Sequence, residues 1–294
     1  MRFARFLRIL STVGRHGLDE FLVGPGSALA RFAFRVAFFW ADRSGPRGER
    51  LRLAFQDLGP IFVKFGQLLS IRPDLVPTDI TDELSKLQDK VAPFGSRDVV
   101  AILAKAYGKP HEQVFETFDL EPIASASVAQ VHFATLPGGR EVAVKILRPD
   151  VETRFRNDLS SFFLAARQIE KWLPFTRRLR PVAVVETLAQ SVALEMDLRL
   201  EAAAISEMAD NIKADRALPD GNFRVPQVDW RRTAKRVLTI EWIDGISARD
   251  IPAIEAAGLD RKQLGLIILR SFLRHAMRDG FFHADMHQGN LLIE

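Results

Sequence analysis

The chain has 294 residues, of which 47% are hydrophobic and 27% are charged. That composition is typical of a globular protein and excludes a disordered or predominantly membrane-embedded chain. The sequence contains no cysteine, which excludes disulfide bonds and thiolate metal sites.

The net charge of +4 is unevenly distributed. Residues 1–52 contain ten arginines, no lysine and four acidic residues, a formal charge of +6, so the remaining chain carries −2. The basic character therefore belongs to the N-terminal segment, and we expect no nucleic-acid partner.

Residues 1–50 form a basic N-terminal segment with two helical runs. Apolar residues at helical spacing alternate with arginine over residues 3–13, and the run from Ser27 to Ala41 is too short and too charged to cross a bilayer alone. Three interpretations stay open. The segment packs on the domain with its arginines in water, lies on an anionic membrane surface, or is a targeting peptide.

Residues 51–117 are expected to form a helical extension, with helices over 51–58, 60–71, 81–88 and 97–107. The second of these contains Lys64-Phe65-Gly66-Gln67. A glycine inside a helix costs about 1 kcal/mol relative to alanine, so Gly66 indicates that another group approaches the helix backbone closely.

Residues 118–245 change to the alternation of β-strands. Strands are predicted over 131–136, 141–147, 223–228 and 236–240, and helices over about 152–172 and 182–212. The prediction is an α+β fold built on an antiparallel sheet.

Residues 246–294 are expected to contain helices over 249–257 and 261–278, followed by the loop His283-Ala284-Asp285-Met286-His287-Gln288-Gly289-Asn290. Asp285 and Asn290 have the spacing of a kinase catalytic loop, where the acid accepts the proton of the attacking hydroxyl and the amide holds a metal on ATP. The competing interpretation is a polar loop held by local hydrogen bonds. His283 is expected to shape this loop, and the role of His287 stays open between a structural and a catalytic one. No zinc site is expected.

Lys145 lies in Val-Ala-Val-Lys on the strand that follows a loop of small residues. A phosphate site needs a point charge beside backbone amides, which such a lysine and loop can supply, although the same tetrapeptide occurs in ordinary strands. Asp197 and Glu201 are four residues apart on a predicted helix, so they share a face and either could pair with the lysine. Their competing interpretation is a solvated acidic stripe.

The loop before Lys145 has side chains where kinases have glycines. Its residues are Ala124, Ser125, Ala126, Ser127, Val128 and Ala129. Because each carries a Cβ, we expect a stiffer loop that contacts nucleotide differently. His132, on the strand behind it, is expected to be a packed or exposed strand residue and not a catalyst.

In this order, the motifs resemble the UbiB family of atypical protein-kinase-like proteins of ubiquinone biosynthesis, from about Leu51 to the end of the chain. The resemblance implies a protein-kinase-like N-lobe with an N-terminal helical extension and an incomplete helical C-lobe. It implies that Lys145 pairs with Glu201 and reaches the phosphates of ATP, that Asp285 is the catalytic acid, and that Asn290 binds Mg²⁺. The stretch from Ala124 to Val128 would contact ATP.

The resemblance also assigns a regulatory role to the motif around Lys64. Lys64, Gly66 and Gln67 would lie across the site, with Lys64 contacting Glu195 and Asp197 and occluding a protein-substrate groove. The implied activity is that of an ATPase, or of a kinase acting on small molecules or lipids.

The implied setting is the cytoplasmic face of a bacterial inner membrane. The expected partners are an anionic membrane surface and quinone-biosynthesis enzymes or polyprenyl lipid precursors. Two alternatives are a non-catalytic lipid-binding scaffold and a small-molecule phosphotransferase, of which the second gives no reason for the motif around Lys64. The chain ends at Glu294, before an Asp-Phe-Gly-like segment, so we expect a fragment or truncated product with little ATP turnover.

Overall fold

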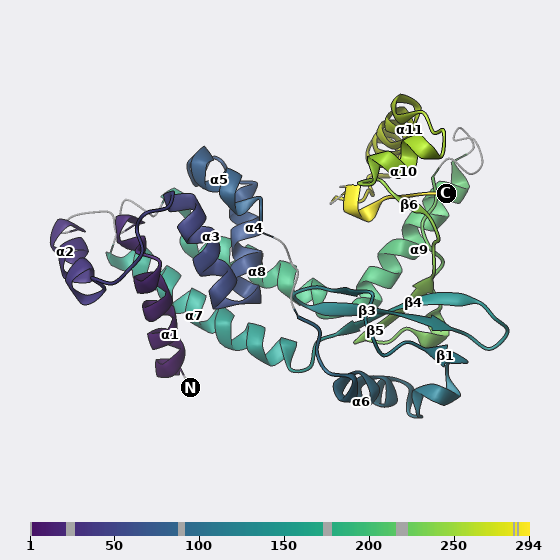
Figure 1. The fold of residues 1–294 in the computed structure, drawn as a ribbon, viewed down its shortest axis with the longest axis horizontal. Helices are drawn as coiled ribbons and strands as arrows, with labels where there is room; N and C mark the ends of the chain where they lie inside the picture. The colour runs from purple at the N-terminus through teal and green to yellow at the C-terminus, as the bar shows by residue number, and fades with distance from the viewer. Residues whose placement is uncertain are drawn as a thin grey trace. The chain divides into compact units, whose positions relative to one another are not determined.

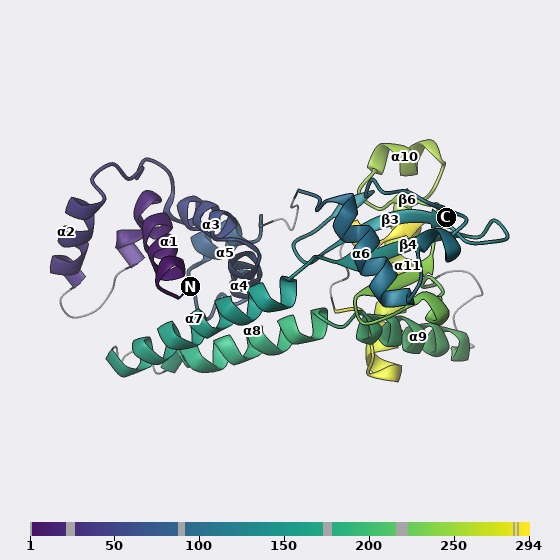
Figure 2. The same cartoon turned by 90° about the horizontal axis from the view of Figure 1, so that it is seen from below.

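The structure is a computed structural model that describes residues 2–21, 27–87, 92–172, 178–215, 223–284, 286 and 288–294. The chain divides into two compact units. The helical unit comprises Met1–Pro93, Ser125–Ala129 and Arg148–Met196, and the sheet unit comprises Phe94–Ala124, Gln130–Leu147 and Asp197–Glu294. Figure 1 and Figure 2 show their elements from two directions.

The helical unit contains α1 (Arg2–Arg15), η1 (Leu18–Phe21), α2 (Ser27–Ala37), α3 (Arg47–Leu58), α4 (Pro60–Ser70), α5 (Thr78–Leu84), α7 (Val151–Trp172) and α8 (Pro181–Glu195). Helices α3, α4 and α5 pack together, and α7 and α8 lie side by side (Figure 2). Pro60 begins α4, as predicted, where its missing amide donor is not needed. Leu58, Ile61 and Leu84 are buried in the core of these helices.

The N-terminal lead packs on the helical unit. His16 of the segment after α1 contacts Asp57 of α3 with 2.9 Å between Nε2 and Oδ2. Asp19 is buried, and its carboxylate accepts hydrogen bonds from Arg35 at 2.6 Å and Arg43 at 3.0 Å. Burial alone would raise the pKa of Asp19, but the two guanidinium groups outweigh it and hold the pKa below its usual value. Arg35 stays largely in water, with its side chain 61% exposed, whereas Arg43 is 28% exposed and departs from the interpretation that the arginines stay in water.

The sheet unit contains α6 (Ser96–Tyr107), η2 (His111–Gln113), β1 (Thr117–Phe118), β3 (Ala129–Thr135), β4 (Glu141–Leu147), α9 (Leu198–Ala214), η4 (Trp230–Arg232), β5 (Val237–Glu241), β6 (Ile246–Ser247), α10 (Ile251–Ala256), α11 (Arg261–Arg274), η5 (His275–Asp279), η6 (Gln288–Asn290) and β7 (Leu292–Ile293). Its main sheet has the strand order β1-β3-β4-β5, with β2 (Ala124–Ser125) paired to β3. The pairs β1–β3 and β4–β5 are antiparallel, which confirms the predicted α+β class.

The core of the sheet unit lies between α6 and the main sheet. Val99 and Leu103 of α6 are fully buried against Val144 and Ile146 of β4 and Val237 of β5. Because side chains alternate along a strand, the buried positions of β4 point to α6 while Lys145 points to the opposite face. The sheet therefore presents this lysine away from its own core.

Several predicted elements differ in extent from the structure. The helix expected over 81–88 is α5, which spans Thr78–Leu84. The helix expected over 182–212 is two helices, because α8 ends at Glu195 and Asp197 caps the start of α9. The strand expected over 223–228 forms only a single bridge, Val228 to Ile240, and Pro226 within it has no amide to donate to a ladder. The helix expected over 261–278 is α-helical only to Arg274 and continues as the π-helical turn η5. Within the described ranges, no helix combines the length and the apolar run that crossing a bilayer requires.

Candidate functional site

Lys145 and Glu201 form an ion pair in the sheet unit. Lys145 Nζ donates to both carboxylate oxygens of Glu201, at 2.8 Å to Oε1 and 2.7 Å to Oε2. Glu201 lies in the first turn of α9, so the break between α8 and α9 decides which residue faces the strand lysine. Both side chains remain partly exposed, at 30% and 42%. The ammonium group is therefore oriented by a carboxylate and open to a ligand.

Asp197, the other predicted acidic partner, has a different role. It is the N-cap of α9, and its side chain accepts the backbone N–H of Arg199 at 3.1 Å. Its carboxylate also binds the guanidinium of Arg199 at 2.9 and 2.6 Å. These hydrogen bonds lower the pKa of Asp197, so it is ionised at neutral pH. Asp197 belongs to the sheet unit, whereas Lys64 and Glu195 belong to the helical unit.

The motif around Lys64 connects three parts of the helical unit. Lys64 on α4 forms an ion pair with Glu195 at the end of α8, with 3.0 Å between Nζ and Oε1. Gln67 donates to the backbone oxygen of Leu87 at 3.4 Å. A Cβ on Gly66 would lie 2.4 Å from Leu87 Cδ1 and 2.8 Å from Phe55 Cδ2. The close approach inferred from Gly66 is thus made by side chains of the helical unit.

The small-residue loop is held by an arginine that sequence reasoning missed. Arg148 donates to Ala126 O at 2.8 Å and to Ser125 Oγ at 2.8 Å, and its own amide donates to Val128 O at 2.9 Å. The amide of Ala126 donates to Ala129 O at 2.8 Å, closing the loop on itself. The signal for Arg148 was its place just after the strand that carries Lys145. The expectation that this loop is stiffer stays a prediction.

One hydroxyl in this loop has no hydrogen-bond partner. Ser127 is buried, and its Oγ has no donor or acceptor among the described residues. A buried polar group is usually satisfied, so this hydroxyl is an exception within the described residues. Ser125, Ala126, Ser127 and Val128 belong to the helical unit, and Ala124 and Lys145 to the sheet unit.

The C-terminal loop is described in part. Asp285 and His287 lie outside the described residues. Asn290 is exposed in η6, between the π-helical turn η5 and the strand β7, which pairs with β6. His283 is exposed in the same loop. The predicted roles of these four residues stay predictions.

His132 is a structural residue of the sheet unit. It is fully buried, its Nδ1 donates to Asp119 O at 2.8 Å, and Gln130 Nε2 donates to its Nε2 at 2.9 Å. Gln130 Oε1 in turn accepts the amide of Phe94 at 3.0 Å. Burial lowers the pKa of His132, against the opposing hydrogen bond to Asp119. The imidazole is therefore neutral and packed, as one of the two predicted interpretations had it.

Few side chains among the described residues could bind magnesium. None of them form a cluster of three or more His, Asp or Glu that could hold a metal ion. Asn290 offers one carboxamide oxygen. Magnesium commonly takes its ligands from one or two carboxylates, substrate phosphates and water, so Asn290 fits only as one ligand among several.

Comparisons with known proteins show which family the chain resembles. Residues 86–294 match the ABC1 atypical kinase-like domain. The chain is 42% identical over 298 residues to the probable protein kinase UbiB of Marinobacter nauticus, covering 100% of this chain and 53% of that protein. For the proteins of the same name from Xylella fastidiosa and Pseudomonas fluorescens the identity is 43% over 295 residues, covering 99% and 98% of this chain and 52% and 54% of theirs. The chain spans about half the length of the curated relatives it matches.

A solved structure has a related fold. Rv3197 from Mycobacterium tuberculosis, determined in complex with erythromycin, matches with a TM-score of 0.52 and 26% identity. The match covers 90% of this chain and 62% of that one.

Proposed function

Because the chain belongs to the UbiB family of ABC1 atypical kinase-like proteins, we propose that it is part of an ATP-binding protein that supports ubiquinone biosynthesis. The observation that carries this proposal is the Lys145–Glu201 ion pair, which orients an ammonium group on a strand. A lysine held in this way contacts the phosphates of ATP in protein kinases.

The roles of the other residues follow from this site. Lys145 neutralises charge on the phosphates, and Glu201 holds the lysine in place. Asp285 would accept the proton of an attacking water or hydroxyl, and Asn290 would help to hold a magnesium ion on the phosphates. Magnesium supplies charge neutralisation on the phosphates when it is bound. The activity is ATP hydrolysis or phosphoryl transfer to a small molecule or lipid.

Nucleotide binding by single variants tests the proposal. Lys145→Ala removes the ammonium group, so we expect ATP affinity to fall by about tenfold or more, since hydrogen bonds to charged groups contribute about 1.5–3 kcal/mol. Lys105→Ala is the matched control, because Lys105 is an exposed lysine on α6. Calorimetric titration with ATP and magnesium measures both. Equal affinity in wild type and Lys145→Ala would refute the assignment of Lys145.

Turnover tests the role of the acid separately. Asp285→Asn removes the proton acceptor while leaving Lys145 in place, so any ATP hydrolysis is expected to fall while ATP affinity is retained. Ubiquinone content in a bacterium lacking its UbiB protein, complemented with each variant, measures the biosynthetic role.

The setting proposed for this activity is the cytoplasmic face of a bacterial inner membrane. The N-terminal segment is basic, and α2 with the turn after it exposes Phe32, Phe39 and Trp40 at 65%, 78% and 62%. Arginines beside exposed aromatic rings are typical of segments that lie on an anionic bilayer surface. Quinone-biosynthesis enzymes and polyprenyl lipid precursors are the proposed partners there.

The exposed aromatic face of α2 also favours a second candidate, a non-catalytic lipid-binding scaffold. Co-sedimentation with phosphatidylglycerol vesicles measures membrane binding, and Phe39→Ser/Trp40→Ser is expected to reduce it. Ile123→Ser, an exposed apolar residue of the sheet unit, is the control. Vesicle binding without any ATP binding would favour the scaffold over the ATP-dependent protein.

A further inference from the structure

Two adjoining cavities lie within the helical unit. One has a volume of about 400 Å³ and the other about 330 Å³. They share Leu69, Leu75, Leu179 and Val184 in their linings, so they are neighbours. Each volume falls within the range of about 300–1,000 Å³ that is common for small-molecule sites.

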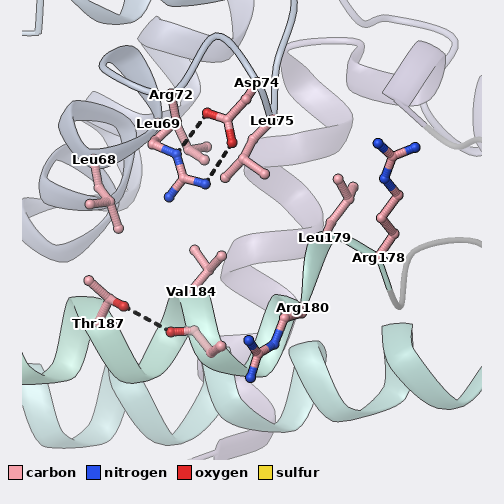
Figure 3. A pocket seen from close by; sticks show the side chains of 11 residues that line it. Leu68, Leu69, Arg72, Asp74, Leu75, Arg178, Leu179, Arg180, Val184 and Thr187 are labelled. Atoms are coloured by element: carbon pink, nitrogen blue, oxygen red, sulfur yellow. Dashed lines mark hydrogen bonds and ion pairs between the residues drawn. The ribbon is translucent and has the colours of Figure 1, made fainter.

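The larger cavity is lined by charged groups with an excess of arginine. Arg72, Arg178 and Arg180 line it together with one acid, Asp74 (Figure 3). Arg72 donates to both oxygens of Asp74, at 2.8 and 2.7 Å, so these two charges neutralise each other. Neither Arg178 nor Arg180 has a side-chain hydrogen bond or ion pair with another described residue. The lining therefore carries a formal charge of +2 on these two exposed guanidinium groups.

The smaller cavity is apolar. Every residue that lines it is aliphatic, aromatic or proline, among them Phe65 of α4 and Phe162 and Ala166 of α7. The rings of Phe65 and Phe162 lie 5.1 Å apart between centroids. Phe65 stands between Lys64 and Gly66, so the motif that binds Glu195 through its lysine also lines this cavity. A cavity with such walls does not hold water well and favours a hydrocarbon ligand.

We propose that the two cavities form one binding site for an anionic amphiphile. Its acidic head lies at the charged lining of the larger cavity, which Arg178 and Arg180 enter from different sides (Figure 3), and its hydrocarbon chain enters the apolar cavity beside Phe65. A phosphate monoester carries about −1.5 to −2 charges at pH 7, which suits a lining with a net positive charge. Arginine is suited to this role because its planar fork binds phosphate through two parallel hydrogen bonds. This site belongs to the helical unit and does not depend on ATP binding at Lys145.

Calorimetric titration of the whole chain with three probes tests the site. Dodecyl phosphate, used below its micelle concentration, carries both head and chain, whereas dodecanol lacks the charge and inorganic phosphate lacks the chain. We expect dodecyl phosphate to bind one per chain and at least about tenfold more tightly than either of the others, because each of them satisfies one cavity only. Inorganic phosphate binding as tightly as dodecyl phosphate would overturn the proposal.

Paired variants assign head and chain to their cavities. Arg178→Gln/Arg180→Gln is expected to weaken dodecyl phosphate at least about tenfold and leave dodecanol unchanged, since only the charged contacts are removed. Ala165→Trp fills the apolar cavity and is expected to weaken both probes. Unchanged dodecyl phosphate affinity in either variant would overturn the assignment, and the thermal midpoint of each variant shows that it is folded.

Matched controls lie on α7, the helix that carries Ala165. Arg156→Gln/Arg167→Gln removes two exposed charges of α7, and Leu164→Trp adds an indole next to Ala165, but none of these residues lines either cavity. Both controls are expected to bind dodecyl phosphate like wild type. Pelleting with phosphatidylglycerol vesicles then separates two sources of the amphiphile. Reduced pelleting of Arg178→Gln/Arg180→Gln supports a bilayer lipid at this site, and unchanged pelleting supports a dispersed amphiphile there.

Discussion

Lys64 and Glu195 are joined by an ion pair that connects α4 to the C-terminal end of α8, with Nζ and Oε1 3.0 Å apart. The two residues are far apart in the sequence, and their side chains are only 22% and 30% exposed. The motif around Lys64 therefore has a structural role inside the helical unit, whatever ligand the whole protein binds.

A double-mutant cycle of Lys64→Met and Glu195→Gln isolates this pair. Because the charges are partly shielded from water, we expect a coupling energy of about 0.5–1 kcal/mol in urea unfolding, near the upper part of the range for such pairs. The Arg261–Glu255 pair, with both side chains more than half exposed, is the matched control and is expected to give a coupling near zero. Equal coupling in the two pairs would contradict the role given to burial.

Gly66→Ala tests the packing against α4. Alanine gains about 1 kcal/mol in helix propensity over glycine, but overpacking typically costs about 1–3 kcal/mol. The new Cβ would lie 2.4 Å from Leu87 and 2.8 Å from Phe55, so we expect the packing cost to dominate and the protein to lose stability. Gly265→Ala on α11, where no atom lies within 4 Å, is expected to stabilise. Urea unfolding measures both, and two changes of the same sign would refute the argument.

Two histidines in the sheet unit predict a fall in stability towards acid pH. Burial lowers the pKa of His132 and of His275 in the folded state. The unfolded chain therefore binds more protons, and the free energy of unfolding decreases as pH falls below about 6.5, the ordinary histidine value, through the lowered folded pKa. Urea unfolding between pH 8 and pH 5 measures this slope.

Leucine variants separate the two histidines. His132→Leu is expected to flatten the slope and to cost about 1–3 kcal/mol at neutral pH, because Gln130 and Asp119 lose their partner. His275→Leu is also expected to flatten it, without that cost, because neither ring nitrogen has a hydrogen-bond partner among the described residues. A slope that both variants leave unchanged would show that other groups control it.

The two ion pairs of Asp215 lead us to expect that the stability costs of its arginine variants are strongly non-additive. Its side chain is 1% exposed and pairs with Arg274 at 2.6 Å and with Arg278 at 2.7 Å. Either arginine alone leaves the carboxylate paired, so we expect Arg274→Met or Arg278→Met to cost about 1–2 kcal/mol. The double variant removes both arginine partners of a buried charge and is expected to cost about 3–5 kcal/mol. Additive single costs in urea unfolding would contradict this sharing.

Much of the site could be predicted, because the types of its residues and their order along the chain both limit the possible functions. Lys145 on a strand of alternating burial and Glu201 on a following helix are local patterns, and the ion pair that the resemblance implied between them is present. The break before Asp197 was missed because its Ala- and Leu-rich surroundings have high helix propensity, while a capping aspartate is a weaker signal.

Other features depend on contacts that no local pattern contains. Arg148 holds the small-residue loop through backbone oxygens, which any loop offers. The burial of Asp19 depends on Arg35 and Arg43 arriving from separate segments. The paired cavities require α4, α7 and α8 together, so their linings could not be read from a linear sequence.

The division into two units has a consequence for how the chain acquires its structure. The chain passes between the units five times, at residues 93, 124, 129, 147 and 196. Cleavage of the chain at one position therefore cannot separate the two units. The ion pair of Lys64 on α4 can form only after Glu195 has been synthesised. Contacts between such distant residues slow folding, because loop closure is completed before the contact forms. The residues of β3 and β4 are thus synthesised before those of α8 that complete the cavity beside Phe65.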